Sequence, residues 1–289
     1  MTANASPTDR DVTIDVPDGR PLVGRLWTVE RPRGIVVVAH GLGEHGGSYG
    51  HVAEALGRIA RVDVMAVDLR GHGRSPGVRG AVGRYEDLCD DLRAAVAWAA
   101  ARHPGLPRFA IGHSNGGQVV LRSVIDGGLD VSGIVLSNPA LRVVAPIPRW
   151  KRGVGHLLRR FAPAVTLDTG LDLSALTRDP AMIEERRVDP LRHARVNASL
   201  FFGMVEGGAS IAVRAGEVTL PVLVILGESD PIIDPAFTVA TFAGFGSADK
   251  TLLTFPEMLH EPFNEVNRAD VLEAVGRWIG DRLPVDGDY

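Results

Sequence analysis

Hydrophobic and polar residues alternate near the start of the chain, and this pattern gives way to continuous apolar runs further on. Val12, Ile14 and Val16 alternate with polar residues, and a strand pattern resumes over residues 22–29. The sequence Pro-Asp-Gly-Arg at 17–20 lies between them and is typical of a turn. The chain is therefore predicted to open with an antiparallel β-hairpin.

From residue 34 onward, short apolar runs alternate with segments of helical periodicity. The apolar runs predict strands at 35–39, 62–67, 108–113, 133–136, 222–226 and 252–255. The periodic segments predict helices at 51–59, 117–125, 236–242 and 266–279, and a long amphipathic helix with Tyr85, Leu88, Leu92, Val96 and Ala99 on one stripe. Strands that alternate with helices form a parallel sheet with helices on both faces. Sites in such doubly wound sheets lie at the carboxyl ends of the strands.

The alternation stops between Pro139 and about Gly216. This segment carries prolines and short helical patterns, and it contains no convincing strand. We interpret it as an insertion above the edge of the sheet that would carry the active site. The sequence thus predicts a core domain made of residues 1–138 and 217–289, with a helical cap at 139–216.

Composition narrows the class of protein further. A chain of 289 residues is long enough for one large hydrophobic core. The net charge of -4 and the pI near 6.1 disfavour a nucleic-acid partner. Cys89 is the only cysteine, so no disulfide within the chain and no cysteine-based metal site is expected, and its apolar helical neighbours predict burial. No cofactor or metal is predicted.

The chain carries no sequence signal for export or for crossing a membrane. Residues 1–11 contain no apolar stretch of the kind found in signal peptides, and nowhere do about eighteen apolar residues run together. We therefore expect a cytoplasmic protein. The sequence does not indicate an oligomeric state.

A serine lies between two glycines where the predicted strand 108–113 meets a helix. Gly112, Ser114 and Gly116 form the pattern Gly-x-Ser-x-Gly at this strand-to-helix turn. A serine at such a turn has a strained backbone, and a Cβ at either flanking position would clash with its surroundings. The first N–H groups of the following helix can stabilise negative charge that develops on a substrate oxygen. The pattern favours Ser114 as the nucleophile of an acyl transfer.

A serine hydroxyl needs a base to accept its proton, and the base works best when a carboxylate orients it. Asp230 follows the predicted strand 222–226, and His260 follows the predicted strand 252–255. Both residues therefore leave the carboxyl ends of strands, on the same edge of the sheet as Ser114. The order Ser, Asp, His is the one expected for a nucleophile on this kind of turn. We predict a triad of Ser114, His260 and Asp230.

Other acidic residues and histidines lie near these positions. Asp234 precedes a helical segment, where a role as N-cap explains it better, and Asp230 is favoured over both Asp234 and Glu228. Structural hydrogen bonding is favoured over catalysis for four histidines on this edge, namely His40, His45, His72 and His113.

The glycine-rich sequence His-Gly-Leu-Gly at 40–43 follows the first buried strand. Its glycines allow a backbone N–H to turn towards a substrate carbonyl. The predicted oxyanion donors are the backbone N–H groups of Leu42 and Asn115. Taken with the triad, they supply the parts that acyl transfer requires.

These motifs resemble the α/β-hydrolase superfamily, and within it the monoacylglycerol lipase and lysophospholipase branch of serine hydrolases. The resemblance spans nearly the whole chain. It rests on His-Gly-Leu-Gly-Glu-His at 40–45, Asp-Leu-Arg-Gly-His-Gly-Arg-Ser at 68–75, Gly-His-Ser-Asn-Gly-Gly at 112–117, Gly-x-x-Asp at 227–230, His260-Glu261, and the cap stretches 172–180 and 189–191. It implies an α/β-hydrolase fold and a carboxylester hydrolase that acts without a cofactor on monoacylglycerols or similar single-chain esters, beneath a mobile cap.

Two positions depart from the pattern of this branch. Its members usually carry Met directly after the nucleophile, where this chain has Asn115, and the backbone donor is kept while the side chain becomes polar. They also tend to carry Arg before the tyrosine of the oxyanion loop, the loop that begins at His40 and carries Leu42, where this chain has Ser48 before Tyr49. Both departures bear on the alcohol and acyl groups that the enzyme accepts and leave ester hydrolysis as the expected reaction.

The predicted substrate contacts come from the oxyanion loop and from the cap. Glu44 belongs to the first of the matching motifs, and Leu200, Phe201 and Met204 are candidates to line an acyl channel, with ordinary packing inside the cap as an equal alternative. Residues 149–161 mix Trp150, Val154, Leu157, Leu158 and Phe161 with basic side chains at helical spacing. This segment is either a lid helix with its apolar stripe on the domain or an interfacial helix that makes transient contact with a lipid surface and attaches the protein peripherally to it.

The predicted function is hydrolysis of monoacylglycerols or similar esters through an acyl-enzyme. Fold and triad do not choose the acyl donor, so a short-chain esterase, thioesterase, aminopeptidase or perhydrolase would use the same residues. A haloalkane dehalogenase is disfavoured because it needs a carboxylate in place of Ser114. A non-catalytic ligand-binding protein is the more distant alternative, because it would not need a complete triad.

Overall fold

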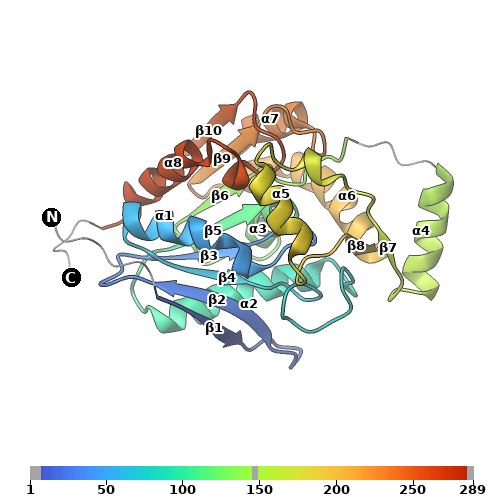
Figure 1. Ribbon diagram of the computed structural model, residues 1–289, viewed down its shortest axis with the longest axis horizontal. Coiled ribbons are helices and arrows are strands. Elements are labelled where there is room, and N and C mark those ends of the chain that lie inside the picture. Colours follow the sequence, from blue (N-terminus) through green and yellow to red (C-terminus); the bar gives the residue numbers. More distant parts are fainter. Residues whose placement is uncertain (1–7, 145–148, 285–289) are drawn as a thin grey trace.

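The computed structural model describes residues 8–144 and 149–284, except for the side chains of 149–152. Its central sheet has eight strands in the order β1-β2-β4-β3-β5-β6-β9-β10 (Figure 1). The strands are β1 (Thr8–Ile14), β2 (Leu22–Thr28), β3 (Ile35–Ala39), β4 (Asp63–Val67), β5 (Arg108–His113), β6 (Gly133–Ser137), β9 (Val222–Gly227) and β10 (Lys250–Phe255). β2 is antiparallel to β1 and β4, and all other pairs are parallel. The predicted hairpin and parallel sheet are confirmed.

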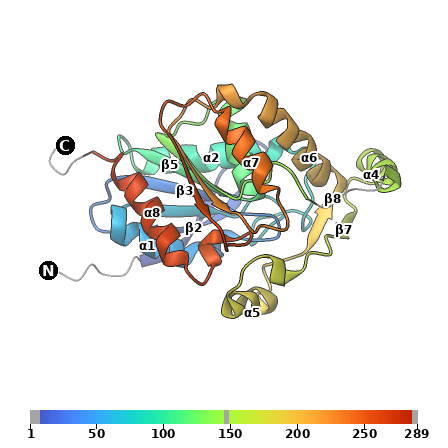
Figure 2. The same cartoon turned by 90° about the horizontal axis from the view of Figure 1, so that it is seen from above.

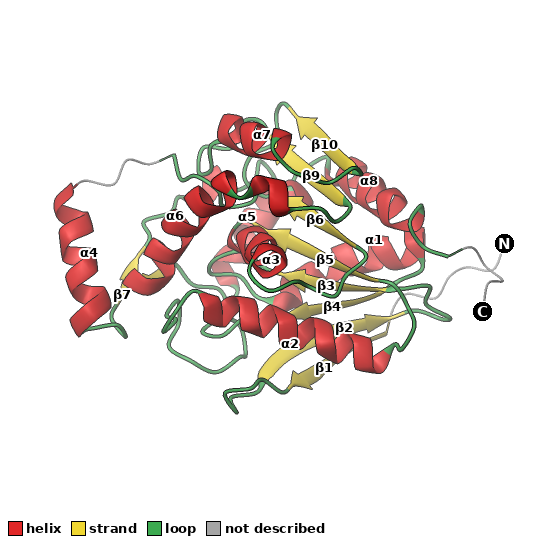
Figure 3. Cartoon of the chain, turned by 180° about the vertical axis from the view of Figure 1, so that it is seen from behind, coloured by secondary structure: helices red, strands yellow, loops and turns green. Residues whose placement is uncertain are grey.

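Helices cover both faces of the sheet. α1 (Gly50–Ala60) and α8 (Arg268–Gly280) pack together on one face. On the other face lie α2 (Glu86–Arg102), α3 (Asn115–Ile125) and α7 (Pro235–Ala243), which Figure 3 shows from that side. Each of these helices matches one predicted from periodicity. Cys89 is buried in α2, as expected, and burial raises the pKa of its thiol to about 11.

The continuous apolar runs are explained by burial on both faces. In β3 every residue is buried, but successive side chains point to opposite sides of the sheet. Ile35, Val37 and Ala39 pack in the core beneath α2 and α3. Val36 and Val38 pack in the second core beneath α1 and α8. A strand enclosed in this way has no polar face, so it gives no alternating pattern.

Between β6 and β9 the chain forms a separate layer at the carboxyl ends of the parallel strands (Figures 2 and 3). Its elements are α4 (Arg149–Phe161), β7 (Thr166–Asp168), η2 (Leu173–Ala175), α5 (Pro180–Val188), β8 (Arg195–Asn197), α6 (Ala198–Val213) and η3 (Ala215–Glu217). β7 and β8 form a small antiparallel sheet that the sequence analysis missed, because strands of three residues are too short to show periodicity. The division of the chain at 139–216 stays a prediction. None of the described helices is long and apolar enough to cross a bilayer.

Glycines allow α6 to lie very close to the body of the molecule. A Cβ on Gly203 would come within 2.5 Å of Tyr85, and a Cβ on Gly208 would lie 2.0 Å from the Leu141 carbonyl oxygen. Gly207 faces Gln118 on α3, whose Nε2 donates to the Met204 carbonyl at 2.7 Å. These contacts hold α6 directly above the start of α3.

Replacing Gly208 by Ala is expected to lower the free energy of unfolding by about 3 kcal/mol, because a backbone carbonyl cannot yield to the new methyl group as a flexible side chain would. The matched control is Gly153→Ala in α4, where no atom lies within 4 Å of the added Cβ. That change should be neutral or stabilise by up to about 1 kcal/mol. Urea denaturation of both variants measures the difference, and equal stabilities would contradict the packing described for α6.

Candidate active site

Ser114 lies at the tight turn between β5 and α3. Its backbone has φ 52° and ψ -118°, a region that residues other than glycine rarely adopt. A Cβ on Gly112 would lie 2.5 Å from the Gly116 carbonyl oxygen, and a Cβ on Gly116 would lie 2.0 Å from that of Ala39. Glycine is therefore required at both flanking positions, and the turn has the geometry that the sequence predicted.

Three side chains from separate loops form a hydrogen-bonded chain at this turn. The Ser114 Oγ lies 2.9 Å from His260 Nε2, and His260 Nδ1 lies 2.7 Å from Asp230 Oδ2. Asp230 leaves the end of β9, and His260 leaves the end of β10. His260 and Asp230 are both buried. The structure thus brings together the three residues that the sequence singled out.

Asp230 is held in its ionised form by several donors. Its Oδ1 accepts hydrogen bonds from the backbone N–H groups of Ile232 and Ile233, at 2.8 and 3.1 Å. Burial opposes the charge, but His260 and these N–H groups outweigh it and hold the pKa of Asp230 below its ordinary value. The alternative acid, Asp234, instead accepts from the Phe237 N–H at the start of α7 and acts as its N-cap.

Asn138 is a residue of this site that the sequence analysis missed. It follows β6 with a positive φ of 39°, and its Nδ2 donates to Asp230 Oδ2 at 2.7 Å and to the Leu259 carbonyl at 3.1 Å. Its Oδ1 accepts from the Gly227 N–H at 2.8 Å. One amide therefore ties the loops after three strands together. An asparagine at the carboxyl end of a buried strand, where positive φ is tolerated, was the available signal.

The loop after β3 is fixed by a buried histidine. His40 Nδ1 donates to the Gly41 carbonyl at 2.7 Å, because its Nε2 must accept from the Leu69 N–H at 3.1 Å. This arrangement needs a neutral ring, and burial lowers the pKa of His40 accordingly. In the described part of the chain, no hydrogen bond is found from the N–H of Leu42 or of Asn115, the two predicted oxyanion donors. Both groups remain free to bind a substrate oxygen.

Glu44 is buried at the base of the same loop, and both of its carboxylate oxygens have protein partners. Oε2 accepts from the Gly41 N–H and from the Tyr49 hydroxyl, each at 2.9 Å. Oε1 faces Arg186 at 3.1 Å and Arg192 at 3.4 Å, both from the layer above. Burial opposes its charge, but His113 and the two guanidinium groups hold the pKa of Glu44 well below its ordinary value. Its predicted role in substrate binding stays a prediction.

The other predicted substrate contacts lie on α6. Leu200 and Met204 are buried, and Phe201 is half-buried beside them. They pack in the core that α2 and α3 share, so their role as the lining of an acyl channel also stays a prediction. The polar side chain of Asn115 is anchored here, since its Oδ1 accepts from the Tyr85 hydroxyl at 2.8 Å.

The remaining histidines of this edge have structural partners. His45 Nε2 lies 2.6 Å from Asp189 Oδ2, and His113 Nδ1 lies 3.1 Å from the Ser137 carbonyl. The ring of His72 packs between those of His40 and His193, with centroids 5.1 and 4.8 Å away. His72 Nδ1 also lies 3.1 Å from the Arg70 carbonyl, so each of these histidines has a hydrogen-bond partner of the kind that the sequence favoured.

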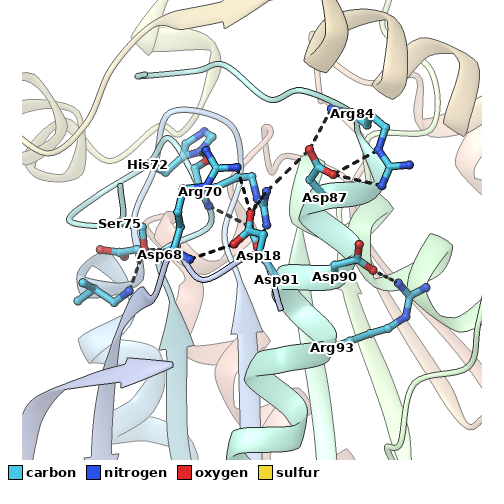
Figure 4. Close-up of polar contacts among 12 residues, drawn as sticks. Asp18, Asp68, Arg70, His72, Ser75, Arg84, Asp87, Asp90, Asp91 and Arg93 are labelled. Atoms are coloured by element: carbon cyan, nitrogen blue, oxygen red, sulfur yellow. Dashed lines mark hydrogen bonds and ion pairs between the residues drawn. The ribbon is translucent and has the colours of Figure 1, made fainter. Parts of the chain in front are cut away.

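The loop after β4, residues 68–75, forms a polar network beside this site (Figure 4). The Asp68 carboxylate accepts from the N–H groups of Gly46 and Arg74, at 2.6 and 2.7 Å. Arg70 extends towards α2, where it binds Asp91, and its Nη1 reaches Asp18 of the N-terminal hairpin at 3.0 Å. The network fixes the loop against the oxyanion loop on one side and against α2 on the other.

Among the described residues, Glu44, His113 and Glu261 offer atoms within 4.8 Å of one another, a spacing that could hold a metal ion. The Arg186 guanidinium already lies against both carboxylates, at 3.1 and 2.6 Å. A cationic side chain thus already pairs with both carboxylates of this group. The expectation that the protein needs no metal stays a prediction.

Comparison with known proteins gives consistent results. The model of a family described as serine aminopeptidase, S33, matches residues 30–267. A monoacylglycerol lipase of Mycolicibacterium smegmatis is 36% identical over 267 residues, which cover 92% of this chain and 95% of that protein. The crystal structure of a monoacylglycerol lipase from Paleococcus ferrophilus has a TM-score of 0.80 at 29% identity, covering 95% of this chain and 99% of that one. A soluble variant of monoglyceride lipase from Saccharomyces cerevisiae, in complex with a substrate analogue, has the same fold, with a TM-score of 0.82 at 23% identity over 99% and 98% of the two chains.

The sheet topology and the serine on its strand-to-helix turn define an α/β-hydrolase of the serine hydrolase class. The chain belongs to the serine aminopeptidase S33 family, within the branch of α/β-hydrolases that resembles monoacylglycerol lipases, and it is a serine ester hydrolase. The resemblance seen in the sequence motifs is confirmed.

The buried histidines predict a loss of stability in mild acid. Burial and the neighbouring His40 and His193 hold the pKa of His72 well below its ordinary 6.5, so only the unfolded chain binds a proton there as the pH falls below that value. The free energy of unfolding should therefore decrease as the pH falls below about 6.5, by up to about 1.4 kcal/mol per pH unit for each such histidine. Urea denaturation between about pH 7.5 and about pH 5.5 measures this slope.

The variant His72→Gln isolates the contribution of one residue. In this variant the free energy of unfolding should decrease less steeply as the pH falls. His156→Gln on α4 is the matched control, because His156 is exposed. A His72 variant with the slope of the unmodified protein would contradict the assignment of His72 as a buried neutral ring.

Proposed function

We propose that the chain hydrolyses monoacylglycerols or similar single-chain esters through a Ser114-His260-Asp230 triad and an acyl-enzyme. The observation that carries the proposal is the continuous hydrogen-bonded chain from Ser114 Oγ through the imidazole to Asp230, at 2.9 and 2.7 Å. The monoacylglycerol and monoglyceride lipases among the relatives support esters as substrates, in preference to the amides that an aminopeptidase would cleave.

The first half of the reaction forms the acyl-enzyme. Ser114 Oγ attacks the ester carbonyl while His260 Nε2 accepts its proton, and the carboxylate of Asp230 stabilises the imidazolium that results. The carbonyl oxygen becomes an oxyanion and accepts hydrogen bonds from the N–H groups of Leu42 and Asn115. When the intermediate collapses, the imidazolium gives its proton to the departing alcohol.

The second half uses the same groups with water as the nucleophile. His260 removes a proton from the water as it attacks the acyl carbon, and the proton then passes to Ser114 Oγ as that oxygen leaves. The products are a carboxylic acid and the regenerated serine. Every proton transfer runs through one imidazole, whose orientation depends on Asp230 and, through it, on Asn138.

Ser114→Ala is expected to lower kcat for p-nitrophenyl esters by about 10⁴-fold or more, because no nucleophile remains to form the acyl-enzyme. Ser123→Ala is the matched control, since Ser123 is a buried serine that lies further along α3. It should keep its activity and its labelling by a fluorophosphonate probe. Undiminished turnover by the Ser114 variant would reject the proposed mechanism.

We further propose that α4 makes the contact with lipid. Its side chains Val154, Leu157 and Phe161 share one face, and they are 48%, 60% and 70% exposed. The opposite face packs on α6, where Gly155 and His156 contact Phe202. The apolar stripe therefore points away from the domain, which is the arrangement of an interfacial helix.

The basic residues of α4 favour the same interpretation. Arg159 and Arg160 are exposed near its carboxyl end. The side chains of Arg149, Trp150, Lys151 and Arg152, which the sequence analysis included, lie outside the described residues. Figure 1 shows α4 at one end of the molecule, beyond α6 and the β7–β8 pair, where a flat surface can approach it.

The double variant Leu157→Ser with Phe161→Ser should weaken turnover of monoacylglycerol in vesicles by about tenfold or more, because two large apolar side chains no longer enter the lipid. Hydrolysis of a soluble short-chain ester should stay unchanged. Val213→Ser is the control, because Val213 is 88% exposed at the end of α6. Equal loss on both substrates, or no loss on vesicles, would contradict the role of α4.

A further inference from the structure

Arg186 is a charged residue buried in the layer above the active site. It projects from α5, its side chain is only 9% exposed, and its Nη1 lies 3.1 Å from Glu44 Oε1 and 2.6 Å from Glu261 Oε1. A buried cation is stable only when it is paired and hydrogen-bonded. The two carboxylates meet this need, and a single guanidinium nitrogen thereby joins two separate loops.

Each of these carboxylates is tied to a group that the reaction uses. Glu44 also accepts from the Gly41 N–H, next to the predicted oxyanion donor of Leu42. Glu261 directly follows His260 in the chain, and its second oxygen accepts from Asn264 Nδ2 at 2.8 Å. Arg186 therefore contacts the loop after β3 that carries Leu42, here called the oxyanion loop, and the loop after β10 that carries His260, here called the histidine loop.

The two carboxylates depend on Arg186 to different degrees. Glu44 has a second cation in Arg192 at 3.4 Å. For Glu261, Arg186 is the only cation within ion-pair distance among the described residues. Loss of the guanidinium would leave a buried carboxylate next to the catalytic imidazole with no opposite charge, which favours displacement of its loop towards water.

The segment around α5 is attached to the same two loops elsewhere. Asp189 binds His45 at 2.6 Å, and the His193 N–H donates to the Gly43 carbonyl at 3.1 Å. The Leu176 carbonyl accepts from the Glu261 N–H at 2.8 Å. These bonds each reach one loop, whereas the Arg186 side chain reaches both.

We propose that Arg186 is a positioning residue for ester hydrolysis, which holds the oxyanion loop and the histidine loop at the spacing that Ser114 needs by bridging Glu44 and Glu261. This inference rests on the proposed function. Arg186 acts on the transition state that all esters share, because the groups that it holds touch the carbonyl and the serine. Its loss should therefore lower kcat to the same extent for short and long acyl chains.

The test compares Arg186→Gln with Arg187→Gln. Arg187 is the next residue of α5, its side chain is 62% exposed, and it pairs with Glu184 one turn earlier. For p-nitrophenyl acetate and for a long-chain p-nitrophenyl ester, Arg186→Gln should lower kcat by about 10- to 100-fold, the range expected when reacting groups move by about 1 Å. KM should change by less than about threefold for either ester, and Arg187→Gln should match the unmodified protein.

A second variant separates positioning from stability. Arg186→Gln combined with Glu261→Gln removes the unpaired buried charge and leaves Glu44 paired with Arg192. Its melting temperature should return towards that of the unmodified protein, while kcat stays low because the bridge between the loops is absent. Recovery of kcat together with stability would overturn the inference, since a merely structural ion pair behaves in that way.

The other outcomes are equally decisive. If Arg186→Gln turns over like Arg187→Gln, or if its defect is confined to KM for the long ester, Arg186 does not position the catalytic loops. The activity of each Arg186 variant is compared with that of Ser114→Ala. Activity that survives the loss of Ser114 rejects the proposed function itself, whereas an inactive Ser114 variant beside a fully active Arg186 variant rejects only this inference.

Discussion

The site depends on one close contact between backbones. Gly116, in the first turn of α3, lies against the carbonyl of Ala39 at the end of β3, where a Cβ would come within 2.0 Å. This approach places the N-terminus of α3 beside the loop that begins at His40, so that the N–H groups of Leu42 and Asn115 can face the same space. It also imposes the positive φ of Ser114, since the chain must turn sharply between β5 and α3. This backbone strain is confined to Ser114, whose side chain projects from the turn.

Around that contact the protein buries many ionisable groups, and for two of them the hydrogen bonds select one protonation state. His40 is held neutral because one ring nitrogen must accept from a backbone N–H, whereas Asp230 is held ionised by N–H donors and by His260. In water these groups would exchange protons near neutrality or in mild acid. Inside the protein, hydrogen bonds select the neutral form of His40 and the ionised form of Asp230.

The sheet and the loops that carry Ser114, Asp230 and His260 could be predicted from the sequence. Strands are recognised from short stretches of residues, and the order of the strands along the chain shows which loops follow their carboxyl ends. Continuous apolar runs such as 35–39 identify strands covered on both faces, and the carboxyl-end rule places Ser114, Asp230 and His260 on one edge. Asn138 and Arg186 escaped detection for a different reason. An asparagine before a proline resembles an ordinary turn, and an arginine within a charged helical stretch resembles a solvated one. Their roles arise only when distant loops are brought together, and such contacts leave no periodic pattern in the sequence.

The layer above the site divides into two parts with different attachments. The part around α5 is joined to the loops after β3 and β10 by ion pairs through Arg186 and Arg192 and by the hydrogen bond between Asp189 and His45. Its displacement would separate charged groups in a buried setting. α4 instead packs on α6 through Gly155 and His156 and turns an apolar face outward, so it can shift without breaking any of those ion pairs. The ion pairs that reach the loops after β3 and β10 therefore restrain the α5 part of this layer, whereas the described contacts of α4 are made with α6.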